Sequence, residues 1–209
     1  MASRNPGSIF ADTQFVFLDR DGVINRKLNE GEYVSTWERF ELLPGVEDAL
    51  ALLNRTGRTV IVVTNQRGIA LNLYTAHDVE EIHNRLQAHL ALHGAHVDAF
   101  YYCPHDNDEC SCRKPSTGLF RKAFLDFLGS SAANSAVIGD SLSDIQAGKA
   151  LGMRTIFLTG DASTRKPGAK LAEAEADAVI RSLAEAVDKY FRDPKWETQR
   201  RECESQPQE

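Results

Sequence analysis

The sequence lacks several features that would place the protein in a membrane or on nucleic acid. No apolar run approaches the ~20 residues that a membrane-spanning helix needs. The opening residues, MASRNPGSIFADT, contain no apolar signal-peptide core, so we expect a cytoplasmic protein. Basic residues are not in excess, because 24 Lys and Arg stand against 30 Asp and Glu, for a net charge of −6. This balance argues against a nucleic-acid partner, which would need a basic face to neutralise phosphates.

Cysteine is also scarce, with four residues in a chain of 209. That number is low for a disulfide scaffold, and three of the four cysteines fall within ten residues of sequence. Such clustering indicates a metal site in a reducing compartment. The fourth, Cys203, lies in a polar stretch near the C-terminus and is expected to be a free thiol without function.

The remaining composition, 42% hydrophobic and 26% charged, is that of an ordinary globular protein. The length favours one domain, which we place at 13–192. Residues 1–12 and 193–209 are expected to be a flexible N-terminal extension and a flexible C-terminal tail, because they are largely polar and charged. We expect a monomer.

Short apolar runs rich in β-formers alternate with segments whose apolar residues recur at helical spacing. The runs predict strands at 14–19, 58–64, 97–102, 135–140 and 153–159, with a weaker one at 176–180. The periodic segments predict helices at 46–56, 76–93, 117–128, 142–152 and 182–191. This alternation predicts an α/β protein with a three-layer, Rossmann-like arrangement, in which helices cover both faces of a central parallel sheet. No stretch between the first three strands holds a separate folding unit, so we expect no large cap domain.

Asp19 and Asp21 come directly after the first predicted strand and before Gly22. The carboxyl ends of the strands line the binding crevice in open α/β sheets, so both acids can aim at one point there. One carboxylate could ligate a cation or attack a phosphorus, and the other could move a proton. Taken alone, the pattern also fits a solvated Asp-Gly turn, which is common.

Polar groups follow the next three strands as well. They are Thr64 and Asn65 after the second strand, Arg113 and Lys114 after the third, and Asp140 and Asp144 after the fourth. Singly, these residues fit helix caps or a surface basic pair. Together they divide into acids that can hold a cation and donors that can hold an anion, all at one edge of the predicted sheet. Phosphate bound together with Mg²⁺ needs that division, because Mg²⁺ joins the carboxylates to the phosphate and neutralises charge during transfer.

The ordered set DxDG, TN, K and GDxxxD resembles the haloacid dehalogenase (HAD) superfamily of phosphotransferases with an aspartate nucleophile. The resemblance spans roughly 14–160 and implies that Asp19 is the nucleophile and forms an aspartyl-phosphate. It implies that Asp21 is the general acid and then the base that activates water. In this resemblance, Thr64 and Lys114 hold phosphoryl oxygens. Mg²⁺ is held by Asp19, the Asp21 carbonyl and Asp140. Asp144 supports the metal site without touching the metal.

The stretch 103–112 contains a second candidate metal site, with three thiols and an imidazole. Cys103, His105, Cys110 and Cys112 form a four-ligand set that suits tetrahedral structural zinc. A disulfide is the alternative, although cysteines two residues apart are poorly placed to bridge and His105 would then have no role. Zinc would fix the loop that presents Lys114, which follows the last cysteine by two residues.

The run Cys-Pro-His…Cys-x-Cys-Arg-Lys-Pro resembles the heptose bisphosphate and histidinol-phosphate phosphatase branch of the superfamily, in its subfamily IIIA. This resemblance implies a small phosphorylated sugar as substrate, first of all a D-glycero-D-manno-heptose 1,7-bisphosphate that loses its 7-phosphate. Histidinol phosphate is the alternative, and a catalytically silent zinc-stabilised binding module is the alternative from another class. The implied substrate contacts are the stretch 27–30, Asn65, Gln66, Arg67 and Arg113.

The chain departs from that branch at several positions. Arg67 stands where heptose enzymes commonly have a small residue, and Leu71 and Asn72 replace their usual Arg-Gly pair. These changes leave the chemistry intact and weaken the prediction of the substrate. Elsewhere, His89 and His93 share one helical face at i, i+4 spacing and could bind a metal. No carboxylate or cysteine motif accompanies them in the sequence, so the favoured interpretation is a helix surface.

Overall fold

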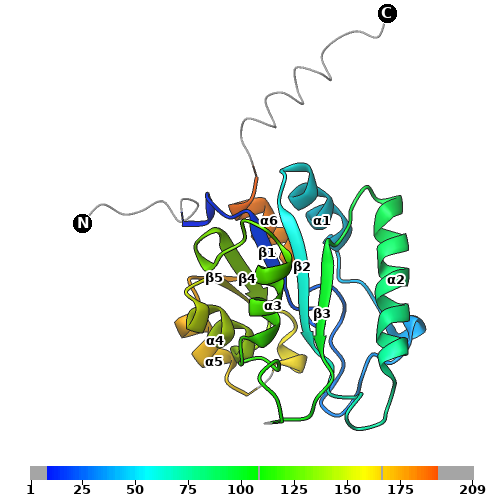
Figure 1. The fold of residues 1–209 in the computed structure, drawn as a ribbon. Helices are drawn as coiled ribbons and strands as arrows, with labels where there is room; N and C mark the ends of the chain where they lie inside the picture. Colours follow the sequence, from blue (N-terminus) through cyan, green and yellow to red (C-terminus); the bar gives the residue numbers. More distant parts are fainter. Residues whose placement is uncertain (1–8, 108, 166, 193–209) are drawn as a thin grey trace, which may run out of the picture.

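The computed structural model of the chain describes residues 9–107, 109–165 and 167–192. The predicted C-terminal tail with Cys203, and most of the predicted N-terminal extension, lie outside these residues. Six parallel strands form one sheet in the order β3-β2-β1-β4-β5-β6, with helices on both faces (Figure 1). The strands are β1 (Phe15–Leu18), β2 (Thr59–Asn65), β3 (Ala99–Cys103), β4 (Ser135–Gly139), β5 (Arg154–Leu158) and β6 (Ala178–Ile180). The predicted α/β fold class and all six predicted strands are confirmed.

The sheet separates two apolar cores, because successive side chains of a strand point to opposite faces. Val16 and Leu18 face one core, which includes residues of α1 (Val46–Arg55), α2 (Ala76–Leu92) and α6 (Leu183–Tyr190). Phe15 and Phe17 face the other, which includes residues of α3 (Gly118–Asp126) and α4 (Leu142–Leu151). Both faces are buried, which is why the strands read as continuous apolar runs.

One further helix and three short 3-10 helices were not predicted from the sequence. The helix α5 (Ala169–Glu175) packs beside α4. The 3-10 helices are η2 (Trp37–Arg39), η3 (Ala132–Asn134) and η4 (Ala162–Thr164). In the described residues, the segments that join β1 to β2 and β2 to β3 contain only η2, α1 and α2, so no cap domain is present there. No helix in the described ranges is long and apolar enough to cross a membrane.

The helix α2 begins as its sequence predicts, and it buries one of its histidines. Thr75 accepts a hydrogen bond from the Asp78 backbone and Asp78 bonds back to Thr75, which completes a capping box. His83 on this helix is buried, at 5% exposed. Its ring stacks on Phe100, with ring centroids 4.3 Å apart. Burial, together with the Arg20 charge, lowers the pKa of His83 to about 3, so this imidazole is neutral.

The packed part of the chain begins before β1, at residues that were expected to be a flexible extension. Phe10, which falls within the predicted extension 1–12, is fully buried. Its ring lies 4.7 Å from that of Tyr190 and 5.9 Å from that of Phe191. The chain therefore joins the core a few residues before the first strand.

Strand register brings the candidate functional residues to one edge. Leu18, the last residue of β1, pairs with Val62 of β2 and with Ile138 of β4. The residues that follow these three positions therefore emerge side by side at the carboxyl edge of the sheet.

Candidate active site

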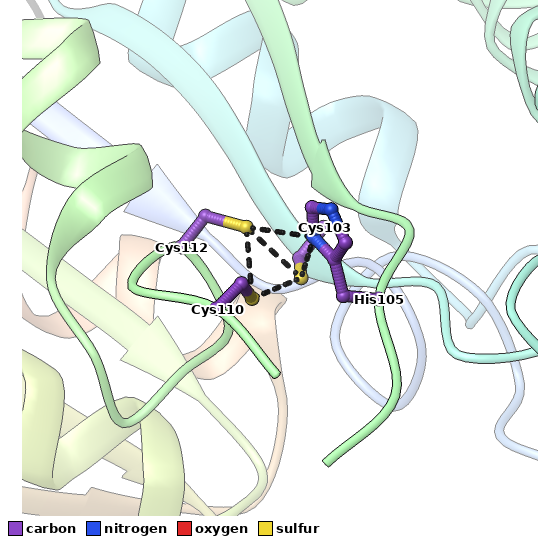
Figure 2. A group of neighbouring side chains, drawn as sticks. All are labelled: Cys103, His105, Cys110 and Cys112. Atoms are coloured by element: carbon purple, nitrogen blue, oxygen red, sulfur yellow. Dashed lines mark hydrogen bonds between the residues drawn. The ribbon is translucent and has the colours of Figure 1, made fainter. Parts of the chain in front are cut away.

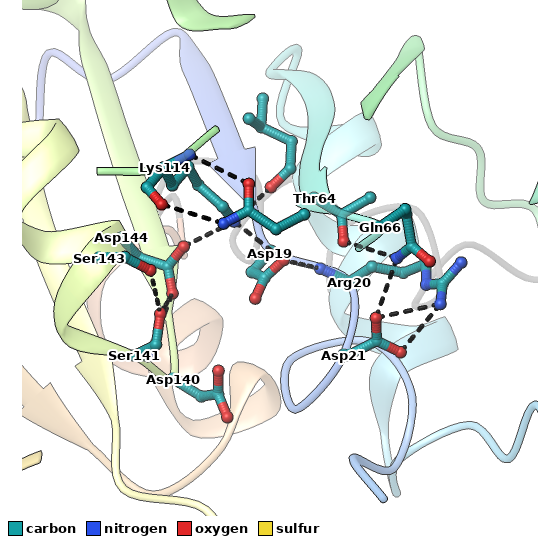
Figure 3. A network of polar contacts seen from close by, with 12 residues as sticks. Asp19, Arg20, Asp21, Thr64, Gln66, Lys114, Asp140, Ser141, Ser143 and Asp144 are labelled. Carbon is teal, nitrogen blue, oxygen red and sulfur yellow. Dashed lines mark hydrogen bonds and ion pairs between the residues drawn. The ribbon is translucent and has the colours of Figure 1, made fainter. Parts of the chain in front are cut away.

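Asp19 and Lys114 form the centre of the polar cluster at the carboxyl edge (Figure 3). The Lys114 Nζ lies 2.9 Å from the Asp19 Oδ1 and 2.6 Å from the Asp144 Oδ1, and it donates to the Val63 carbonyl at 2.6 Å. Burial lowers the pKa of Lys114, but the charges of Asp144 and Asp19 outweigh it, so the net shift is upward. Lys114 is therefore a fixed cation beside the carboxylate that follows β1.

Asn65 holds the backbone of Lys114 in place. Its Nδ2 donates to the Lys114 carbonyl at 3.1 Å, and its Oδ1 accepts from the Lys114 backbone N–H at 3.0 Å. The end of β2 thereby positions the loop that follows β3. The prediction that Asn65 contacts substrate stays a prediction, because its amide is already paired with Lys114.

Asp21 belongs to a second network, on the other side of Asp19. The Arg20 Nη2 donates to both Asp21 oxygens at 3.0 Å, and Asn25 and Gln66 donate to the same carboxylate at 2.9 and 3.1 Å. Burial raises the pKa of Asp21, but the Arg20 charge and these hydrogen bonds outweigh it and lower the pKa overall. Asp21 is thus held as a carboxylate.

Gln66 connects this network to β2 and to the loop that leads to α2. Its Nε2 donates to the Thr64 Oγ1 at 3.0 Å, and its Oε1 accepts from the Tyr74 hydroxyl at 2.8 Å. Thr64 is 1% exposed and Gln66 is 2% exposed. Both amide ends of Gln66 are therefore engaged within the protein, which places it as a support of Asp21 and Thr64.

Asp140 and Asp144 come from the loop after β4 and the first turn of α4. Asp144 accepts from the Ser141 backbone N–H and hydroxyl at 3.1 and 2.6 Å and contacts Lys114, so its carboxylate is occupied. Asp140 pairs with Lys27 through Oδ2, and its buried Oδ1 has no hydrogen-bond partner among the described residues. The backbone at Gly22 passes close to Asp140, and a Cβ at position 22 would lie 2.3 Å from the Asp140 Oδ2. The φ of Gly22, +95°, is also one that favours glycine.

A divalent cation fits between these carboxylates. Oxygen atoms of Asp19, Asp140 and Asp144 all lie within 4.8 Å of one another. Burial, with the charges of Asp19 and Asp144, outweighs the effect of Lys27 and raises the pKa of Asp140 to about 6. Burial likewise raises the pKa of Asp19, and Lys114 only partly counteracts it. Clustered carboxylates with raised pKa values and an unpaired buried oxygen suit a hard cation with oxygen ligands, such as Mg²⁺.

The four residues of the stretch 103–112 that were predicted to bind zinc converge on one point (Figure 2). The three sulfur atoms lie 3.1–3.4 Å apart, and the His105 Nδ1 lies 3.3 Å from the Cys112 Sγ and 3.6 Å from the Cys103 Sγ. The cysteines are free, so the alternative of a disulfide is wrong. The separations are close to the roughly 3.5–3.8 Å that tetrahedral Zn–S and Zn–N bonds impose. The cluster can therefore hold zinc.

The loop that carries the Cys/His cluster, 103–112, also contacts the loop after β2. The Arg113 backbone N–H donates to the Cys110 Sγ at 3.4 Å, immediately before Lys114. Arg67 forms a two-point ion pair with Asp106, through Nε–Oδ1 and through Nη2–Oδ2 at 3.2 Å. The buried Nη1 of Arg113 has no hydrogen-bond partner among the described residues. This guanidinium nitrogen is therefore a buried donor without a partner in the described part of the chain.

Comparison with known proteins gives the family. A family model described as HAD-hydrolase-like matches residues 111–186. A D-glycero-alpha-D-manno-heptose-1,7-bisphosphate 7-phosphatase of Mycobacterium tuberculosis is 42% identical over 175 residues, covering 81% of this chain and 87% of the relative. The chain belongs to the HAD-like hydrolases. The predicted superfamily and the prediction of a phosphatase are confirmed.

Other HAD-like relatives agree with this assignment. A D-glycero-beta-D-manno-heptose-1,7-bisphosphate 7-phosphatase of Vibrio cholerae is 38% identical over 176 residues, covering 80% of this chain and 91% of the relative. The crystal structure of a D,D-heptose 1,7-bisphosphate phosphatase from B. bronchiseptica, complexed with magnesium and phosphate, matches with a TM-score of 0.71. That protein is 30% identical, and the match covers 84% of this chain and 97% of that one.

Several residues of this HAD-like site carried no signal in the sequence analysis. Arg20 is 1% exposed and turns back onto Asp21, where its sequence position indicated only a loop residue. Asn25, Tyr74 and Asp106 were likewise not predicted as parts of the site. Arg20 and Asn25 lie within four residues of their partner Asp21, but only the turn after β1 directs their side chains onto it. Asp106 meets Arg67 across 39 residues, a contact that spacing along the sequence could not reveal.

Proposed function

We propose that the protein is a Mg²⁺-dependent phosphatase that removes the 7-phosphate of a D-glycero-D-manno-heptose 1,7-bisphosphate through an aspartyl-phosphate. The observation that supports it most is the placement of Asp19 between a buried lysine and a cluster of carboxylates. Such a site combines a nucleophile, a cation for the phosphoryl oxygens and ligands for a metal. The relatives named above supply the substrate class.

Asp19 is the nucleophile in this proposal. Its carboxylate attacks phosphorus, the bond to the sugar oxygen breaks, and the phosphoryl group becomes an acyl phosphate on Asp19. The Lys114 ammonium, 2.9 Å from the Asp19 Oδ1, stands where it can hold a phosphoryl oxygen during transfer. Thr64 is buried beside Asp19 at the end of β2 and offers its hydroxyl to another oxygen.

Asp21 moves the protons. It must carry a proton to the leaving sugar oxygen in the first step and accept one from water in the second. The contacts with Arg20, Asn25 and Gln66 hold it ionised, which is the form that activates water. The acid role therefore requires Asp21 to leave this network when substrate binds. The negative charge of a phosphate nearby then raises the pKa of Asp21 and favours its protonated form.

The metals have separate roles. Asp19, the Asp21 carbonyl and Asp140 would hold Mg²⁺, which would supply positive charge to neutralise the phosphate. Asp144 orients Lys114 and the loop after β4 in this proposal, because its carboxylate contacts Lys114 and accepts a hydrogen bond from Ser141. The Cys/His cluster of Cys103, His105, Cys110 and Cys112 would hold structural zinc and fix the loop from which Lys114 projects.

In this proposal the loops after β2 and β3 form the rim of the site, and their arginines, Arg67 and Arg113, favour a substrate with a second anionic group. Arg113 has an unpaired buried N–H, and Arg67 is the residue that distinguishes this loop from its counterparts in heptose enzymes. Arg67 is held by Asp106, whose negative charge also lies near Arg113. A bisphosphate offers its transferred phosphate to Lys114 and its remaining phosphate to this rim.

Phosphate release from a panel of substrates tests the proposal. The panel contains both anomers of heptose 1,7-bisphosphate, histidinol phosphate and other sugar phosphates, each with Mg²⁺. We expect the heptose bisphosphates to be turned over fastest and Asp19→Asn to abolish the reaction, with ³¹P NMR identifying the phosphate that is lost. If Asp19→Asn is as active as the wild type, Asp19 is not the nucleophile. If all substrates are turned over equally and feebly, the proposed substrate class is wrong.

A further inference from the structure

Two histidines near the end of α2 and a glutamate near the start of α1 lie together on the surface of the molecule. The His89 Nε2 is 3.2 Å from the Glu47 Oε1, and the rings of His89 and His93 have centroids 4.8 Å apart. One ligand atom from each of the three residues lies within 4.8 Å of the other two. The sequence showed the histidine pair without a carboxylate partner, because Glu47 is 42 residues away from His89 and belongs to another helix.

The donor set suits late first-row divalent metals. Imidazole nitrogens and a carboxylate oxygen are ligands for Zn²⁺, Ni²⁺, Co²⁺ and Cu²⁺, whereas Mg²⁺ prefers oxygen alone. Bonds of about 2.1 Å in a tetrahedral site place ligand atoms about 3.4 Å apart. The His89–Glu47 pair, at 3.2 Å, is already close to this separation, and no separation in the group exceeds it by more than about 1.4 Å. A change of side-chain rotamer at His93 can close a gap of that size, since His93 is exposed.

The pair at the centre of the group is restrained before any metal binds. The side chains of His89 and Glu47 are 33% and 25% exposed, and the Trp37 ring lies 6.5 Å from that of His89. Restraint of this kind reduces the conformational entropy that binding would cost. His93 leaves the group open to solvent, which gives an ion an entry path and leaves room for water as a further ligand.

We propose that Glu47, His89 and His93 form a second transition-metal site, which fastens α1 to α2. The site is separate from the Cys/His cluster, because α2 returns toward the amino end of β3 whereas Cys103 is the last residue of that strand. Both helices contribute to the same apolar core, through Leu50 on α1 and Leu86 on α2. An ion shared between them therefore stabilises the folded state alone, since the unfolded chain does not hold the three ligands together.

The alternative is an ordinary surface ion pair. Glu47 lies in the first turn of α1 and His89 in the last turns of α2, positions at which an acid and a base each interact favourably with the helix dipole. An ion pair needs no third residue, so it gives His93 no role. Metal binding requires His93 as much as His89, and this difference separates the two interpretations.

The experiment uses the full-length protein with its Cys/His cluster saturated with zinc and with excess Mg²⁺. Ni²⁺ is titrated by isothermal calorimetry, and thermal unfolding is recorded with and without saturating Ni²⁺. We expect one Ni²⁺ per chain and a rise in Tm of about 5 °C or more at a hundredfold excess over Kd. His93→Gln and Glu47→Gln should each weaken Ni²⁺ at least tenfold and remove the rise in Tm, while phosphate release without Ni²⁺ stays unchanged.

His77→Gln is the matched control, because His77 is an exposed histidine in the first turn of the same helix. This variant should bind Ni²⁺ as the wild type does. Equal Ni²⁺ affinity in the wild type, His93→Gln and Glu47→Gln would overturn the proposal, and so would the absence of a Ni²⁺-dependent rise in Tm. Because two variants on different helices are compared, misfolding of one cannot decide the result.

Discussion

Replacing Lys114 by methionine tests the balance of charge at the candidate active site. Lys114 is 4% exposed and contacts Asp19 and Asp144, which are themselves buried. Methionine keeps much of the side-chain volume and removes the cation, so two carboxylates lose their buried partner. Breaking a buried ion pair from one side costs about 3–5 kcal/mol, because the remaining charge stays desolvated and uncompensated.

A second substitution separates this electrostatic cost from a packing defect. In Lys114→Met combined with Asp144→Asn, one of the two stranded charges is also removed. We therefore expect the double variant to be more stable than the sum of the single effects implies, with a coupling energy of about 1–3 kcal/mol. Phosphatase activity should be lost in Lys114→Met and should not return in the double variant, because the phosphoryl-binding cation is absent in both.

Urea unfolding at pH 7, without added Mg²⁺, measures these free energies, and phosphate release measures activity. Lys149→Met provides the control, since Lys149 contacts Asp177 at the same 2.6 Å distance with its side chain 38% exposed. An exposed pair of that kind contributes about 0–1 kcal/mol. If Lys114→Met lowers the free energy of unfolding no more than this control does, the buried ion pairs do not have the expected cost. If the effects of the two substitutions are additive in the double variant, the charges of Lys114 and Asp144 are not coupled.

Three further outcomes are expected. Gly22→Ala should lower phosphate release roughly a hundredfold, because its Cβ would displace the Asp140 carboxylate by ångströms; undiminished activity would contradict this. The free energy of unfolding should fall by about 1.4 kcal/mol per pH unit below about pH 6.5, because the unfolded chain protonates His83 whereas burial keeps its native pKa near 3. His83→Gln should remove that slope in urea titrations. Cys110→Ser should lose stoichiometric zinc by metal analysis and, with it, most activity, since the loop bearing Lys114 would no longer be fixed.

Local patterns in the sequence were sufficient to predict the strands and most helices of the fold. Continuous β-branched runs such as 58–64 indicated strands buried on both faces, and the spacing of Val79, Ile82 and Leu86 indicated the inner face of α2. Given parallel strands, the residues after each strand had to meet at one edge. The convergence of Asp19, Lys114 and Asp140 could therefore be predicted without coordinates.

Contacts between side chains from different elements could not be predicted in this way. One such contact is that of the Asn65 amide, which holds the backbone of Lys114 in the folded chain. The burial of His83 likewise had no signal in the sequence, because it depends on the path of β3, which brings Phe100 against the ring.

The sequence by itself determined which chemical groups stand at the end of each strand, because strand periodicity and parallel connection are encoded locally and fix where a strand stops. Only the tertiary structure decided which of those groups are paired with each other. Arg20 turning onto Asp21, Lys27 reaching Asp140 and Glu47 meeting His89 depend on loop paths and helix orientations that many distant contacts set together.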